Sequence, residues 1–243
     1  MNPNILGVGI ALNGVVDSDK GISIFSPHYN WKNFGLKKIL TEKYHYPFSL
    51  DNDVRLMALG ELEHGAAKGE NNFILININD GIGAGIIIDK KIYSGSQHFA
   101  GEIGHIRVSE ENAPCSCGKT GCLESFLSNE NIINLANNKY YLDIKDFNDL
   151  KNKFNNKNPQ CELLVDELIN KLSSVILPTI NLLNPNIILI NGNINSLGKD
   201  FYKKLTLKLN NNSIIKIKIK PSKLGDSSAS LGAVSMIFND IYK

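Results

Sequence analysis

The feature that most constrains the fold of this chain is a cluster of cysteines. Three of the four cysteines fall within eight residues, in the stretch Cys115-Ser116-Cys117-Gly118-Lys119-Thr120-Gly121-Cys122, and His105 precedes them. Three thiolates and one imidazole make up the tetrahedral set of four ligands that structural zinc prefers. Gly118 and Gly121 allow the tight turn that would direct the sulfurs to one point. The sequence therefore predicts a zinc site with the ligands His105, Cys115, Cys117 and Cys122.

Four protein ligands would fill the coordination shell of this ion. It would then activate no water, and its role would be structural. The alternative is three buried free cysteines, which the clustering and the glycines disfavour. The fourth cysteine, Cys161, stands alone at the start of a predicted helix and is expected to be a packing residue.

Composition excludes several classes of protein. Hydrophobic residues make up 42% of the chain and charged residues 21%, which is typical of a globular protein. The net charge of +2 is too small for a surface that coats nucleic acid. No apolar stretch is long and uninterrupted enough for a transmembrane helix, and no signal peptide is recognisable. We therefore expect a cytoplasmic protein, in which clustered cysteines favour a metal over disulfides.

Periodicity predicts strands that alternate with helices, which is typical of an α/β protein. The expected strands are 5–11, 47–50, 73–78, 85–88, 187–190 and 214–220. The expected helices are 34–43, 54–68, 162–183, 197–209 and 227–241. A glycine turn over 79–84 is expected to join two strands as a hairpin. The asparagine-rich stretches 148–158 and 210–212 are expected to be solvated loops.

Three motifs occur in a specific order: Asp51-Asn52-Asp53, Gly101-Glu102-Ile103-Gly104-His105, and the cysteine cluster followed by Glu124. Together they resemble the ROK family, which contains sugar kinases and sugar-responsive repressors. The resemblance runs from about Leu6 to the C-terminus. It implies an actin-like ATPase (ribonuclease H-like) fold with two lobes, a sugar in the cleft, and a dimer or tetramer.

The resemblance also implies how the chain is divided. Residues 1–70 would form a partial N-terminal lobe, with the helix 227–243 packing back onto it. Residues 71–226 would form the large lobe with the zinc loop 105–122. The N-terminal lobe would be incomplete, which would leave the strand 5–11 with an unpaired edge.

The residues that match the sugar contacts of the family are Gly14, Asn52, Asp53, Glu102, His105 and Glu124. Asp53 matches the general base of the kinase members, and His105 would bind both zinc and a sugar hydroxyl. The chemistry agrees, because carboxylates, an amide and an imidazole can satisfy hydroxyls that both donate and accept.

Each of these residues also has an ordinary structural interpretation. Asp51 or Asp53 could cap the helix that begins at Val54, and we expect Asp51 to be the cap and Asp53 to contact the sugar. Glu102 and Glu124 could be surface charges. Gly81 and Gly83, which match the second phosphate loop of the kinases, could simply be turn glycines. The lysines of the strand 214–220 are expected to lie on a solvated face or to protect an edge.

Three departures from the kinase pattern separate this chain from the enzymes. The first phosphate loop of the kinases, Asp-x-Gly-Gly-Thr, would lie upstream of Met1. Asp80 stands where kinases have a threonine before Gly81, and its negative charge would repel a phosphate. The turn on the adenosine side, usually rich in glycine, reads Asn191-Gly192-Asn193. Phosphoryl transfer depends on stabilising phosphate charge, so these changes should be severe.

The sequence is therefore interpreted as the sugar-binding, effector-sensing domain of a ROK transcriptional regulator. DNA would be a partner only through a helix-turn-helix, and none is recognisable in these residues. The second hypothesis is an ATP- and Mg²⁺-dependent hexose or N-acetylhexosamine kinase with a truncated start, in which Asp53 is catalytic. The third is a remnant that retains only the zinc-stabilised lobe.

Overall fold

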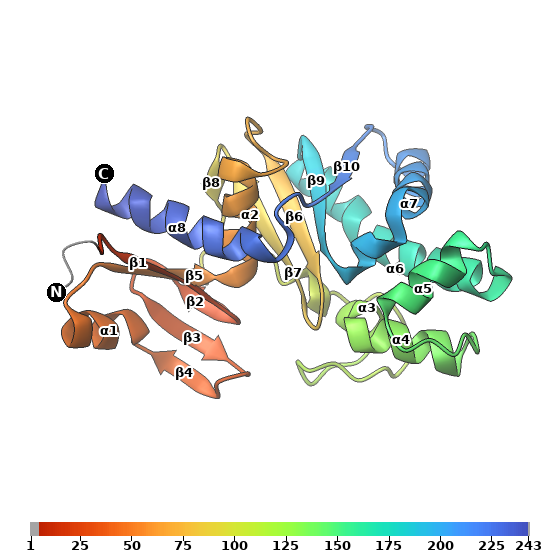
Figure 1. Cartoon of the computed structure of the whole chain (residues 1–243), viewed down its shortest axis with the longest axis horizontal. Helices are drawn as coiled ribbons and strands as arrows, with labels where there is room; N and C mark the ends of the chain where they lie inside the picture. The colour runs from red at the N-terminus through yellow and green to blue at the C-terminus, as the bar shows by residue number, and fades with distance from the viewer. Residues whose placement is uncertain (1–4, 243) are drawn as a thin grey trace. The chain divides into compact units, whose positions relative to one another are not determined.

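The computed structural model describes residues 5–242. The chain is an α/β protein, as predicted, and it divides into two compact units (Figure 1). Unit 1 consists of Met1–Leu75, Ala84–Gly101 and Ser222–Lys243, and unit 2 consists of Ile76–Gly83 and Glu102–Pro221. No helix in the described part of the chain has the length and apolar character needed to span a membrane.

Unit 1 contains a two-stranded parallel sheet, in which β1 (Val8–Leu12) pairs with β5 (Phe48–Asn52). Within residues 5–242, β1 pairs with no strand other than β5, so its second edge is unpaired, as expected. The helix α1 (Leu36–Tyr44) precedes β5, and α2 (Asp53–His64) follows it. Both strands and both helices were predicted to within a few residues.

An antiparallel sheet in unit 1 was not predicted. It consists of β2 (Val15–Asp17), β3 (Ile22–Ser26) and β4 (Trp31–Phe34). These strands have three to five residues each, too few to show a clear alternation. Trp31 packs against the buried cluster of Leu12, Val16 and Leu50, which joins this sheet to the parallel one.

The last helix, α8 (Ser228–Ile241), packs closely against α2 and β1 (Figure 1). Glycines allow this approach. A Cβ atom at Gly232 would lie 1.9 Å from the carbonyl oxygen of Leu56, and one at Gly60 would lie 2.2 Å from that of Ser228. The two helices therefore meet backbone to backbone, so any side chain at these positions would push them apart.

A five-stranded sheet has the order β10-β9-β6-β7-β8, and the boundary between the units falls within β6 (Phe73–Ile78) and β7 (Ile82–Ile88). The short β8 (Lys91–Ile92) pairs antiparallel with β7. The hairpin turn is shorter than expected, because β7 already begins at Ile82. The segment 84–101 clusters with unit 1 rather than with the large lobe expected from the sequence. Gly85 explains this, because a Cβ there would lie 2.5 Å from both Val54 and Ala58 of α2.

In unit 2, β9 (Ile187–Gly192) pairs in parallel with β10 (Lys218–Pro221). The prediction of a strand over 214–220 was wrong in its first half. Ile214 is fully exposed, whereas Ile217 and Ile219 are buried, so only the end of the apolar alternation faces the core. The exposed Lys218 and Lys220 flank Ile219 on β10, as expected of a solvated face.

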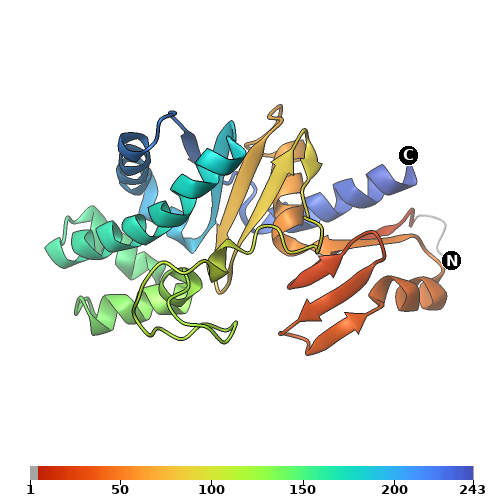
Figure 2. The ribbon, with the colours of Figure 1, turned by 180° about the vertical axis from the view of Figure 1, so that it is seen from behind.

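The helices of unit 2 are α3 (Glu124–Leu127), α4 (Asn129–Asn138), α5 (Phe147–Asn155), α6 (Pro159–Leu183) and α7 (Gly198–Asn212). The long helix α6 packs against α7 (Figure 2). The expectation of loops at 148–158 and 210–212 was wrong except at 156–158, where a turn separates α5 from α6. Asp146 caps α5, and the burial of Leu150 and Phe154 stabilises it, which outweighs the weak helix propensity of asparagine. Cys161 is buried in α6, as expected of a packing residue.

Candidate metal centre and ligand-binding groups

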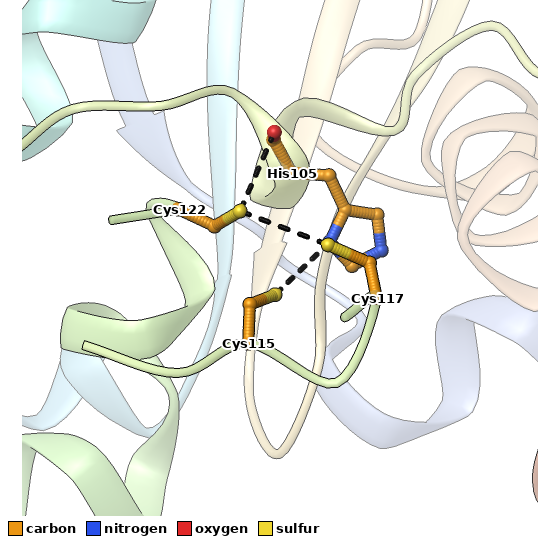
Figure 3. Close-up of side chains that lie close together, drawn as sticks. All are labelled: His105, Cys115, Cys117 and Cys122. Carbon is orange, nitrogen blue, oxygen red and sulfur yellow. Dashed lines mark hydrogen bonds between the residues drawn. The ribbon is translucent and has the colours of Figure 1, made fainter. Parts of the chain in front are cut away.

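His105, Cys115, Cys117 and Cys122 converge in unit 2, as the sequence predicted (Figure 3). Their ligand atoms all lie within 4.8 Å of one another. The Cys115 Sγ lies 3.5 Å from the His105 Nδ1, and the Cys117 and Cys122 sulfurs are 3.8 Å apart. Bonds of about 2.3 Å to sulfur and about 2.0 Å to nitrogen separate tetrahedral ligand atoms by roughly 3.5–3.8 Å. The cluster can therefore hold a metal ion with little rearrangement.

The backbone of the loop produces this geometry. Cys115 and Lys119 are joined by a hydrogen bond from N–H to carbonyl of 2.9 Å, and Gly118 donates to the carbonyl of Cys115 at 3.0 Å. Gly118 and Gly121 have φ angles of +83° and +75°, which side chains rarely adopt. A Cβ at Gly121 would also lie 2.2 Å from the carbonyl of Ser109. The two glycines are thus required for the turn, as predicted.

The thiols differ in their acidity. Burial, followed by the neighbouring thiols, raises the pKa of Cys122 to about 12. The exposed Cys117 has a lowered pKa, chiefly because its sulfur accepts a hydrogen bond from the backbone of Lys119. Metal ligands must be thiolates, so an ion entering the cluster would have to displace the proton of Cys122.

His105 has two different neighbours. Its Nδ1 faces the cysteines, whereas its Nε2 lies 3.8 Å from the Glu102 carboxylate. A carboxylate here can orient a ligating imidazole once this distance shortens to that of a hydrogen bond. The glycine before His105 is required as well, because a Cβ at Gly104 would lie 2.3 Å from the carbonyl of Ile82 in β7.

Glu124 connects the cysteine loop to the glycine turn. Its Oε1 accepts a hydrogen bond of 2.6 Å from the Ser116 hydroxyl, and its Oε2 accepts one of 3.2 Å from the backbone N–H of Ile82. The carboxylate is therefore held from two sides, next to Gly81. Ser116 was not singled out from the sequence, because a serine between two cysteines carries no spacing signal.

Gly14, Asn52 and Asp53 come together in unit 1. The Asn52 Nδ2 donates a hydrogen bond of 2.9 Å to the carbonyl of Gly14. Gly14 has a φ of +89°, and a Cβ there would lie 2.3 Å from the carbonyl of Phe25. Asp53 is the first residue of α2, and burial raises the pKa of its half-buried carboxyl. A raised pKa is what a carboxylate that takes up a proton requires.

The cap of α2 differs from the prediction. Asn52, not Asp51, is the cap residue, and its Oδ1 accepts hydrogen bonds of 3.0 Å from the N–H groups of Val54 and Arg55. Asp51 lies one residue too early. It is buried and forms an ion pair with Arg55 instead, with 2.6 Å between Asp51 Oδ1 and Arg55 Nη2. Burial, which outweighs the effect of Arg55, raises the pKa of Asp51 to about 6.

The turn that matches the second phosphate loop is occupied by protein groups. The Asp80 carboxylate accepts a hydrogen bond of 3.1 Å from Asn129 Nδ2 at the start of α4. A hollow of about 550 Å³ lies nearby in unit 2, between α4, the start of α5 and the turn after β9. Half of its polar lining residues carry side-chain amides, namely Asn129, Asn134, Asn148 and Asn193. The sequence did not reveal this hollow, because its walls come from three distant segments.

The fold is that of an α/β protein of the actin-like ATPase class, and its His/Cys cluster has the residues and the geometry that could hold a metal ion. Residues 2–239 match the ROK family, and the chain belongs to this family. The resemblance stated from the three sequence motifs is thereby confirmed.

Curated relatives include both regulators and an enzyme. The xylose repressor of Caldicellulosiruptor bescii is 29% identical over 253 residues, which cover 98% of this chain and 63% of the repressor. The glucokinase of Halalkalibacterium halodurans is 40% identical over 134 residues, covering 55% of this chain and 41% of the kinase. The chain thus spans less than two thirds of the length of either relative.

A solved structure agrees with this relationship. A ROK family transcriptional regulator, described as a homologue of the Escherichia coli MLC protein, superimposes with a TM-score of 0.87 at 28% identity. The match covers 97% of this chain and 63% of the regulator. The relatives of this chain therefore include transcriptional regulators as well as a kinase.

Proposed function

We propose that this chain is the sugar-binding, effector-sensing domain of a ROK transcriptional regulator. The observation that carries the proposal is the repressor match over 98% of the chain, whereas the kinase match covers 55%. A sugar would be bound by Gly14, Asn52, Asp53, Glu102, His105 and Glu124. In this role, sugar binding would shift the equilibrium of a DNA-binding part, which is how an effector acts.

The ion in the His/Cys cluster is proposed to be zinc, because three thiolates and one imidazole are the ligand set that zinc favours. Bound zinc would supply structural stabilisation only, since all four positions are taken by protein groups. His105 would be oriented between the ion and Glu102. Ser116 would hold Glu124 in place, so the loop would preorganise two proposed sugar contacts at once.

Asp80 supports a sensor over a kinase. Its carboxylate is fixed at the turn by Asn129, where a phosphate would approach in a kinase. The negative charge of Asp80 would repel a phosphate at this turn unless a cation lay between them. The kinase remains the second candidate, because the glucokinase relative has the higher identity, 40%, over the region that it shares.

Thermal melting of the whole chain with xylose, glucose and N-acetylglucosamine tests this proposal, together with release of ADP from ATP and Mg²⁺. A sugar-dependent rise in melting temperature without ADP release is expected. ADP release with any sugar would establish the kinase instead. No shift with any sugar, in a protein that carries its zinc, would leave the remnant hypothesis.

Asp53→Asn separates these outcomes further. For a sensor, the loss of charge should weaken sugar binding by about ten- to a hundredfold, the value of one charge-assisted hydrogen bond. For a kinase, turnover should disappear. Asp19→Asn is the matched control, since Asp19 is an exposed aspartate of the same unit, and it should change neither readout.

A further inference from the structure

Arg55 is a buried charge whose purpose the proposed function does not yet explain. It lies in α2 with 2% of its surface exposed, and its Nη2 donates to Asp51 Oδ1 at 2.6 Å and to the carbonyl of Val16 at 2.7 Å. Its Nε and Nη1 are also buried, and they have no hydrogen-bond partner within residues 5–242. Desolvation offsets most of the attraction in such a pair, so a buried ion pair rarely adds net stability.

We propose that Arg55, paired with Asp51, is a positioning residue that fixes Asn52 and Asp53 for sugar binding. This inference rests on the proposed function. Arg55 would contact no sugar itself. It would act through the backbone of the junction between β5 and α2, where both proposed sugar contacts lie.

The hydrogen bonds around this junction form a continuous path. Asp51 Oδ1, held by Arg55, accepts a bond of 2.6 Å from the backbone N–H of Asn52. The same guanidinium nitrogen holds the carbonyl of Val16 in β2. Arg55 therefore ties the junction to a strand that begins one residue after Gly14. The backbone of Asn52 and Asp53 is thus fixed relative to β2 and to the turn at Gly14 that precedes it.

The side chain of Asn52 shows what this positioning serves. Its Oδ1 accepts two hydrogen bonds from the N–H groups at the start of α2, and one N–H of Nδ2 donates to the carbonyl of Gly14. Within the described chain, only the second N–H of Nδ2 remains for a ligand. A single N–H has one direction, so a small rotation of the junction would move it away from a sugar hydroxyl.

The opposite end of β2 is held as well. Asp17 accepts a hydrogen bond of 2.9 Å from the backbone of Lys20, and its Oδ2 lies 3.5 Å from the Nε2 of His98. With Val16 bound by Arg55 and Asp17 bound in this way, β2 is a fixed reference for the junction. A guanidinium suits this role because its rigid plane fixes the directions of the two N–H bonds of Nη2, which donate to the carboxylate and to the carbonyl, whereas an ammonium rotates freely.

The test is the double variant Asp51→Asn/Arg55→Met, studied in the zinc-loaded full chain. Replacing both partners removes the buried charges together, so we expect the melting temperature of the free protein to stay the same or rise. Sugar affinity, measured by calorimetry with the sugar that stabilises the wild type, should fall at least tenfold. A fall in sugar affinity without a fall in melting temperature would show that the pair serves binding and not stability. Unchanged affinity in a folded double variant would overturn the proposal.

Two further measurements make the test decisive. Arg55→Lys keeps the charge but loses the fixed N–H directions of the planar guanidinium, and its sugar affinity should lie between those of the wild type and the double variant. Lys38→Met/Glu42→Gln neutralises an exposed pair on α1 of the same unit, with 3.9 Å between Nζ and Oε1, and should change neither stability nor affinity.

Amide hydrogen exchange separates this proposal from the proposed function. If the wild type binds no sugar, the proposed function fails, and the positioning role is still measured by the exchange of the Asn52 and Val54 N–H groups. We expect their protection to fall at least tenfold in the double variant while the core of α2 stays protected. Unchanged protection would overturn the positioning role by itself.

Discussion

The two groups of proposed sugar contacts are held together in different ways. In unit 2, His105 and Glu124 lie within 20 residues of each other in sequence and are ordered by the loop that forms the metal cluster. In unit 1, Gly14 and Asn52 lie 38 residues apart and are ordered by hydrogen bonds between separate elements. The first arrangement would depend on an ion, and the second depends on the packing of strands and helices.

This difference shows how each group should fail. Removing the ion should release Glu124 and His105 together while the rest of unit 2 keeps its core. Unit 1 has no comparable centre within its described residues, so its group should fail only when α2, β2 or α8 moves. The following predictions test this contrast, in order of expected effect.

Cys122→Ser should have the largest effect. It removes a buried ligand, so bound zinc, measured by mass spectrometry of the metal, should fall from one per chain to near zero. The free energy of unfolding of unit 2 should fall by about 5 kcal/mol or more, because metal binding is coupled to folding. Cys161→Ser is the matched control, because Cys161 is equally buried but does not belong to the cluster. This variant should retain the zinc. Retention of zinc by Cys122→Ser would contradict the four-ligand site.

Gly232→Ala should have the next largest effect, confined to unit 1. The new Cβ would lie 1.9 Å from the carbonyl of Leu56, so α8 must move away from α2. Overpacking of this kind costs about 1–3 kcal/mol, which is a fall of several degrees in melting temperature. Hydrogen exchange should increase in α2 and α8 but not in α6. Gly35→Ala, where no atom lies within 4 Å, should leave α2 and α8 unchanged, and any loss should be confined to α1, of which Gly35 is the N-cap.

Glu167→Gln should have a smaller effect that depends on pH. Burial alone would raise the pKa of Glu167, but hydrogen bonds from Lys139 and Tyr140 outweigh it and lower the pKa. A lowered pKa stabilises the folded state above the unfolded pKa, and this contribution is lost as pH falls through the folded value. The variant should lose about 1.5 kcal/mol near pH 7. The wild type and the variant should converge as the pH falls below the ordinary value of 4.5 and through the lowered pKa of Glu167, which denaturation at several pH values would measure.

The contribution of the buried Asp51 in unit 1 to stability should depend on pH in the opposite direction to that of Glu167. The pKa of Asp51 is raised to about 6 from 3.8, so its folded form binds a proton more readily than its unfolded form. Its contribution to stability therefore decreases as pH rises from about 4 to about 6. Exchange measured separately for β5 and α6 between these pH values should show this opposite trend. The same trend in both elements would contradict it.

Asp200→Asn should have the smallest effect. Asp200 pairs with Lys157 at 2.6 Å, but both side chains are about 60% exposed. Exposed pairs are screened by water and salt, so we expect no measurable change in melting temperature. A clear loss would show that the turn between α5 and α6 depends on this surface contact with α7.

The sequence predicted the local part of the candidate site well. The ligand set, the two loop glycines and the strand Phe73–Ile78 follow from patterns within short stretches, and the structure places them as expected. The Asn52 cap was missed because three adjacent residues, Asp51 to Asp53, can all cap a helix, and burial decides among them. The role of Arg55 was invisible because its partners include a backbone carbonyl of a strand too short to predict.

The packing of α8 on α2 has a consequence for the order in which this protein is synthesised. Most of unit 2 is one continuous segment, Glu102–Pro221, to which Ile76–Gly83 is added. Unit 1 needs α8, whose first residue follows the end of α2 by 164 positions. At about 5–20 residues per second, α2 would wait roughly 10–30 s on the ribosome for its partner. During that interval the face of α2 that carries Gly60 would lack α8 as its cover, so unit 2 should complete its fold first and unit 1 should close only once α8 has been synthesised.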